Sequence, residues 1–184
     1  MKLLILVTLI ATAVTACSKE LALARTEPSK KAAFAVDTGK GFHFELGRGS
    51  GMDGLDTVAF GRDGVVTMFR QHPQGKWQTA ALKLPPIAIT RIFEVVKAQK
   101  IMKMPSAFHA DVHDGTQWVL WIKQNQKFKA IYFNNYFPAG VKRLAEQLDQ
   151  ELAAVGLIRA EWKDVPIKKF REHEKPLWKS VKHP

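Results

Sequence analysis

The chain has 184 residues, and 28 Lys and Arg against 17 Asp and Glu give it a formal net charge of +11 at pH 7. This excess favours anionic partners and opposes cationic ones. A single cysteine excludes an internal disulfide, so stability has to come from a hydrophobic core. A chain of this length can form that core as one domain.

Residues 1–16 have the layout of a secretory signal peptide. Lys2 precedes an apolar run from Leu3 to Val14, and small residues follow it. The run is too short for a transmembrane helix, which takes about 20 apolar residues. We therefore expect this segment to direct export.

The signal segment ends in Val14-Thr15-Ala16-Cys17, which resembles the lipobox of bacterial lipoproteins. The resemblance implies that the Cys17 thiol receives a diacylglycerol, that the chain is cut before this residue, and that the new amine is acylated. Two or more acyl chains hold a protein stably on a membrane, whereas one chain binds only marginally. In that family an Asp in the place of Ser18 favours the inner membrane, so the resemblance implies an outer-membrane lipoprotein that faces the periplasm.

Ordinary secretion is the alternative to lipid attachment. Ala22-Leu23-Ala24 has the small-residue pattern of a signal peptidase site, and a cut there would discard Cys17. Against it, Lys19 and Glu20 would put two charges between the apolar run and the cut.

Residues 17–39 show no sustained period and predict a lipid-anchored tether. From Gly41 to Leu46 apolar and polar residues alternate, which predicts a half-buried strand. The glycine-rich residues 47–54 resemble a phosphate-binding loop in composition only, since a strand follows them instead of a helix. We expect a flexible connection there.

Residues 56–60 and 65–69 flank Gly61-Arg62-Asp63-Gly64 and predict a hairpin. Residues 77–84 predict one more strand. Pro85-Pro86 then favours a helix start, because proline fits the first helical turn. The helix carries one apolar stripe, made of Ile89, Ile92, Phe93 and Val96.

A polar loop is expected at 105–115, followed by a second hairpin of residues 116–123 and 127–133. A second helix is predicted after Pro138, with Gly156 placed to cap its C-terminus. The apolar stripe of this helix consists of Val141, Leu144, Ala145, Leu148 and Leu152.

This order of strands, helix, hairpin and helix predicts an α+β fold. We expect an antiparallel sheet of about five strands with two helices packed on one face, in a single domain at 40–158. The segments "GRDGVVTM", "LPPIAITRIFEVV", "DGTQWVLWI" and "NNYFPAGVKRLAEQLDQEL" resemble uncharacterised bacterial envelope domains over about residues 55–156. The resemblance implies the fold and no particular activity.

Residues 159–184 carry eight Lys and Arg against four Asp and Glu and form a basic C-terminal tail. Pro166 and Pro176 are expected to interrupt any long helix, so the tail either wraps around the domain or is left loose. Aromatic residues between the charges would suit an anionic surface. The candidate binding residues in the tail are Lys168, Lys169, Arg171, Lys175 and Lys179.

The densest group of possible metal ligands is His109-Ala110-Asp111-Val112-His113-Asp114. Zinc accepts imidazole nitrogens and carboxylate oxygens, so His109, Asp111 and His113 form a candidate metal site. A structural loop explains the same residues, because Asp bonds its own backbone in turns. No third distant ligand is evident, and we expect no cofactor.

Two further groups have both a functional and a structural interpretation. His43 and Glu45 share a strand face and could pair as acid and base, although plain alternation explains them equally. A set of aromatic residues beside Lys123, Lys127 and Lys129 could form a stacking platform, or could be core contacts between strands. That set is Trp118, Trp121, Tyr132, Tyr136 and Phe137.

Two classes of function remain open. The first is a non-enzymatic binding or accessory module, held on the membrane by its N-terminal lipid, for an anionic envelope polymer, lipid head groups or a protein partner. The second is a metal-dependent periplasmic hydrolase centred on the His109–Asp114 loop. A nucleic acid is not an expected partner in the periplasm, and residue patterns alone favour no particular oligomeric state.

Overall fold

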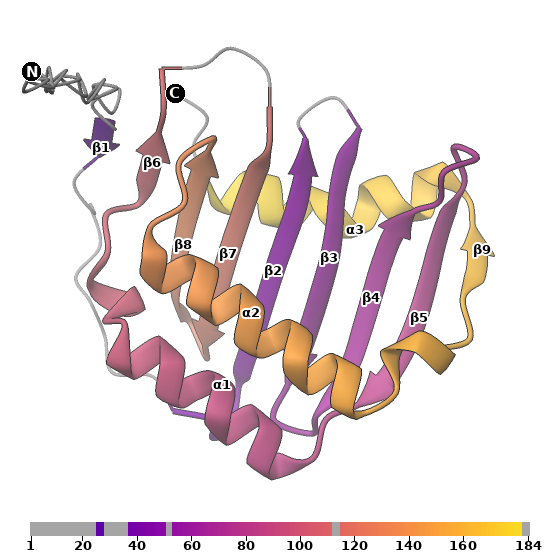
Figure 1. Ribbon diagram of the computed structural model, residues 1–184, viewed down its shortest axis with the longest axis horizontal. Helices are drawn as coiled ribbons and strands as arrows, with labels where there is room; N and C mark the ends of the chain where they lie inside the picture. The colour runs from indigo at the N-terminus through magenta and orange to yellow at the C-terminus, as the bar shows by residue number, and fades with distance from the viewer. Residues whose placement is uncertain (1–24, 28–36, 51–52, 112–114, 182–184) are drawn as a thin grey trace, which may run out of the picture.

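The computed structural model describes residues 25–27, 37–50, 53–111 and 115–181. The predicted signal segment, Cys17 and most of the expected tether lie outside the described residues. In the described part of the chain nine strands form one sheet, in the order β1-β6-β8-β7-β2-β3-β4-β5-β9 (Figure 1). β6 and β8 pair in parallel and all other neighbours are antiparallel, so the sheet is mixed.

The elements have the following bounds. The strands are β1 (Arg25–Glu27), β2 (Phe42–Ser50), β3 (Gly54–Gly61), β4 (Val65–Gln71), β5 (Trp77–Lys83), β6 (Ala107–His109), β7 (Gln117–Gln124), β8 (Lys127–Asn134) and β9 (Lys163–Val165). The helices are α1 (Pro86–Ala98), α2 (Ala139–Ala154) and α3 (Ile167–Ser180), with short 3-10 turns η1 (Ile101–Lys103) and η2 (Leu157–Arg159).

The expected sheet of about five strands with two helices on one face was wrong, although the class is α+β. Three of the additional strands, β1, β6 and β9, have only three residues each, too few for a readable alternation. β6 lies inside the expected polar loop at 105–115. The expected flexible connection at 47–54 was also wrong over its first half, because β2 continues to Ser50.

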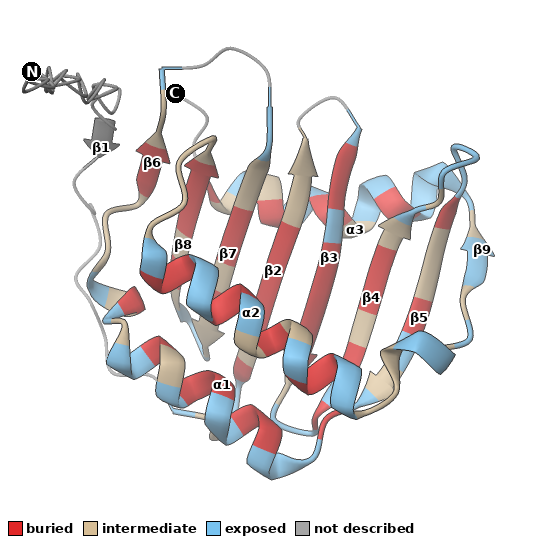
Figure 2. Ribbon diagram, in the orientation of Figure 1, coloured by how far each residue is buried: buried red, intermediate tan, exposed pale blue. Residues whose placement is uncertain are grey.

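α1 and α2 cover one face of the sheet and bury their apolar stripes against it (Figures 1 and 2). Both helices begin directly after a proline cap, at Pro85 and Pro138. The core between the two layers includes Phe44 and Phe60, whose stacked ring centroids lie 4.8 Å apart. The apolar periodicity of the sequence predicts this part of the fold, in which α1 and α2 pack on one face of the sheet.

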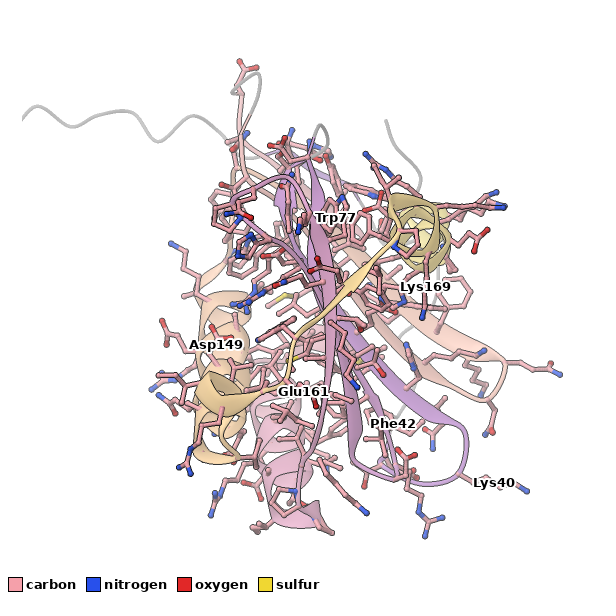
Figure 3. All side chains as sticks on the ribbon, turned by 90° about the vertical axis from the view of Figure 1, so that its right-hand side faces the viewer. Lys40, Phe42, Trp77, Asp149, Glu161 and Lys169 are labelled. Carbon is pink, nitrogen blue, oxygen red and sulfur yellow. The ribbon has the colours of Figure 1, made fainter. Side chains whose placement is uncertain are left out.

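α3 covers the opposite face of the sheet, and Figure 3 shows Lys169 of this helix and Asp149 of α2 on opposite sides. The helix buries Phe170, Glu174 and Leu177. Pro176 lies inside α3, so the expectation that it would interrupt the helix was wrong. A proline removes one backbone hydrogen bond, and the two buried apolar side chains on the sheet offset that loss.

Candidate functional site

The five basic residues predicted as binding candidates from the sequence all lie on α3, and all are exposed. The buried side of this helix is formed instead by Phe170, Glu174 and Leu177. Glu172 is the only other charged exposed residue of α3. Among the described residues, no ion pair involves any of the four lysines, which are Lys168, Lys169, Lys175 and Lys179.

An aromatic stack holds the first half of α3 on the sheet. Phe170 is fully buried, and its ring lies 3.3 Å from that of Trp77 in β5, with 12° between the planes. Phe69 of β4 completes this small cluster. Stacked aromatic pairs add about 0.5–1.5 kcal/mol to the gain from burial. The stack therefore holds α3, and with it the basic residues, at a fixed distance from the sheet.

Two glycines in the sheet let α3 approach closely. A Cβ at Gly47 would lie 2.8 Å from Leu177 Cδ2, and one at Gly54 would lie 2.9 Å from Phe170 Cε1. Gly54 also has φ +95°, which side-chain-bearing residues rarely adopt. The glycine-rich segment therefore makes room for α3, a role that sequence reasoning missed. A glycine inside a strand is the signal for such a close approach.

A polar layer lies between α3 and the sheet. His173 Nε2 lies 2.9 Å from Thr57 Oγ1 and 3.3 Å from Glu45 Oε1. On the same carboxylate, Oε2 lies 3.2 Å from His43 Nε2. Thus β2 brings His43 and Glu45 together as their shared strand face suggests, and α3 supplies a second imidazole that no local spacing connects to them.

Burial lowers the pKa of His173, and the neighbouring His43 acts in the same direction. The carboxylates of Glu45 and Glu174 oppose this shift. The His173 ring also stacks on Phe69, with centroids 4.0 Å apart. The net result favours a neutral imidazole in the packed interface.

This polar layer does not have the arrangement of a catalytic triad. Thr57 and Glu45 both approach the same nitrogen of His173, whereas a histidine that activates a hydroxyl uses one nitrogen for each partner. Thr57 is 1% exposed and Glu45 is 4% exposed, so a substrate cannot reach either. The layer can position α3, and it offers no accessible nucleophile.

Glu174 ties the middle of α3 to β3. Its Oε2 accepts a hydrogen bond from the Leu55 N–H at 3.4 Å, and its Oε1 accepts one from Arg171 at 2.7 Å. Arg171 is therefore partly neutralised by a buried carboxylate, unlike the four lysines. The lysines contribute most of the free positive charge on this face.

The candidate metal site is only partly within the described residues. His109 ends β6, and its ring meets Tyr132 edge-on at 5.5 Å. Asp111 is exposed, and His113 lies outside the described residues. Across the part of the chain that the structure describes, no three His, Cys, Asp or Glu side chains are grouped to hold a metal ion.

The expected aromatic platform is divided between the two faces of the sheet. Trp118 packs on Phe137 at 4.5 Å in the layer of α1 and α2. Trp121 and Tyr132 belong to the cluster under α3. Lys129 is buried, and burial lowers its pKa. These residues therefore act mainly in packing.

A scan against models of protein families found no match, and neither did a search of curated proteins. None of the helices in the described ranges is both long enough and apolar enough to cross a membrane.

Proposed function

We propose that this chain is a lipoprotein anchored in the bacterial outer membrane through Cys17, facing the periplasm. Its domain is a non-enzymatic binding module that lies with α3 against anionic lipid head groups. The observation that carries the proposal is the set of exposed lysines on α3 that form no ion pair with another described residue, on a helix that is itself fixed to the sheet.

The three helices differ in net charge, and α3 is the most basic, since α1 has only Arg91 and Lys97 against Glu94. α3 has five basic and two acidic residues, and one of the two, Glu174, is buried. α2 has two basic residues, Lys142 and Arg143, against three acidic ones. An anionic bilayer would therefore attract α3 more strongly than α1 or α2.

The lysines at the start of α3 are unfavourable for the helix itself. Lys168 and Lys169 lie in the first turn, which contains no acidic residue. A cation near a helix N-terminus opposes the helix dipole and costs roughly 0.3–1 kcal/mol. A surface of phosphates next to this turn would reverse that penalty, because helix N-termini favour anions.

The first residue of α3 adds an apolar contact to the basic face. Ile167 is 58% exposed and directly precedes the two lysines of the first turn. Basic residues beside an exposed apolar side chain are typical of helices that lie on anionic membranes. Each lysine near such a surface contributes about 1 kcal/mol.

Vesicle flotation tests the proposal with the mature chain, residues 17–184, carrying Cys17→Ser so that no lipid is attached. We expect binding to vesicles of equal parts phosphatidylcholine and phosphatidylglycerol, little binding to phosphatidylcholine alone, and loss of binding as salt is raised. The triple variant Lys168→Gln, Lys169→Gln, Lys175→Gln should lose about 3 kcal/mol, or roughly 100-fold in affinity.

A matched control removes the same charge from the opposite side of the molecule. Lys97→Gln, Lys103→Gln and Lys142→Gln change exposed lysines of α1, η1 and α2. This variant should bind anionic vesicles nearly as well as the parent. Equal losses in the two variants, or equal binding to both kinds of vesicle, would overturn the proposal.

A further inference from the structure

A groove lies on the side of the molecule opposite α3. It has a volume of about 710 Å³ and lies between β2, β3 and β4, the last turns of α2, η2 and Trp162. Binding sites for small molecules have volumes of roughly 300–1,000 Å³ and mostly apolar walls. The groove is separate from the basic face, because Asp149, which lines the groove, and Lys169 lie on opposite sides of the sheet (Figure 3).

The exposed surface of the groove is mostly apolar. Val58 and Met68 form part of its surface on the sheet, and Leu152 comes from α2. Leu157 and Ile158 of η2 complete the apolar wall. Ile158 is 94% exposed, so a large apolar side chain lies open to solvent at the edge of the groove. An aliphatic ligand would cover it.

The groove also contains two arginines held in fixed orientations. Arg48 forms two hydrogen bonds of 2.7 Å with the carboxylate of Asp149. Arg70 lies over the Trp162 ring at 3.8 Å and donates from Nε and Nη2 to Gln78. These contacts cover one aromatic face of Trp162, which leaves the aliphatic side chains as the main apolar surface.

Both guanidinium groups keep donors for a ligand. Neither Arg48 Nε nor Arg70 Nη1 hydrogen-bonds another described residue. Both arginines line the same groove, together with the Asp56 carboxyl. Partial burial raises the pKa of Asp56. The Gln71 N–H and the two arginines act in the opposite direction, but burial is the larger effect.

We infer that this groove binds a single-chain aliphatic anion, with the chain against Leu157 and Ile158 at the open side of the groove and the carboxylate at the free donors of Arg48 and Arg70. Fixed guanidinium groups lose little freedom when they bind a carboxylate. The aliphatic wall selects a chain over a planar ring. A carboxylate at this place competes in part with Asp149 for Arg48.

Methyl NMR of the mature Cys17→Ser chain, labelled at Met and Ile, tests the site directly. Decanoate should shift the methyl signals of Met68 and Ile158 and leave that of Ile101, in the core under α1, unchanged. Decanol has the chain without the charge and should bind at least about tenfold more weakly, since a hydrogen bond to a charged group contributes about 1.5–3 kcal/mol. Acetate and decyltrimethylammonium should not shift these signals.

Two variants connect the binding to the groove. Ala153→Trp places a large side chain at an exposed position of the lining and should abolish the shifts. Arg70→Gln should weaken decanoate about tenfold and leave decanol unchanged, whereas Arg143→Gln, outside the lining, should change neither. Circular dichroism checks that each variant is folded.

Equal affinity for decanoate and decanol would overturn the inference, as would shifts that persist in Ala153→Trp. Vesicle binding through α3 is unaffected by either result, because no residue of that helix lines the groove. The two proposals can therefore fail separately.

Discussion

The Phe170 ring lies flat on the Trp77 ring, with centroids 3.3 Å apart. This contact joins the C-terminal helix to the fifth strand, and Phe170 is fully buried there. α3 is thus an integral layer of the fold and not an appendage. Removal of the helix would expose the small aromatic cluster and the polar layer beneath it.

Phe170→Ala should lower the free energy of unfolding by about 3–5 kcal/mol, because it removes a large buried ring and leaves a cavity. Urea denaturation of the mature Cys17→Ser chain measures the loss. Ile167→Ala removes a mostly exposed apolar side chain of the same helix and should change stability by less than about 0.5 kcal/mol. Similar losses in both variants would contradict the packing of α3 described above.

A comparison of Gly54→Ala with Gly75→Ala separates the cost of backbone strain from the cost of a steric contact with α3. Both glycines have positive φ, +95° and +73°, but a Cβ at Gly75 meets nothing within 4 Å. We expect Gly75→Ala to cost roughly 1–2 kcal/mol through strain alone. Gly54→Ala should cost about 1–3 kcal/mol more, because its methyl group would meet Phe170 and Glu174.

Urea denaturation of the two glycine variants, measured side by side, gives the difference. Equal losses would mean that α3 does not press on Gly54. A larger loss at Gly75 would contradict the open space around that turn.

Stability should fall as the pH drops below the usual pKa of histidine, about 6.5. Burial lowers the pKa of His173, so the unfolded chain binds more protons than the folded chain in this range. The stabilising contribution of the neutral imidazole is present above about pH 6.5 and is lost as the pH falls through the lower folded value.

His173→Phe keeps an aromatic ring against Phe69 and removes the titrating group. The difference in the free energy of unfolding between pH 7.5 and pH 5.5 should be smaller for this variant than for the parent. An unchanged pH dependence would show that His173 does not control it.

The longer elements could be predicted from the sequence because each repeats a period several times. α1 and α2 present apolar stripes over 13 and 16 residues, and a proline begins each. The short strands β6 and β9 cannot be recognised in this way, since their pairing is set by the neighbouring strands. Tertiary contacts, and not local patterns, define them.

α3 did carry a readable signal in Phe170, Glu174 and Leu177, whose spacing suits one helix face. Pro176 and the density of lysines obscured it. The polar layer could be predicted in part, because His43 and Glu45 share a strand face. His173 joins them only through the packing of α3, with its partner Thr57 116 positions away in the sequence.

Lysines at the two ends of α3 should affect stability with opposite signs. Lys168 lies in the first turn and Lys179 in the last turn, so the helix dipole disfavours the first and favours the second. We expect Lys168→Gln to raise the free energy of unfolding by roughly 0.3–1 kcal/mol and Lys179→Gln to lower it by a similar amount.

Both substitutions should nevertheless weaken binding to vesicles that contain phosphatidylglycerol, by about 1 kcal/mol or roughly fivefold each. Urea denaturation and vesicle flotation on the same two proteins give the comparison. A variant that becomes more stable while it binds less well separates a role at the surface from a role in folding. If binding instead followed stability, with Lys168→Gln binding better and Lys179→Gln worse, the lysines would act through the helix alone and the anionic surface would not be their partner.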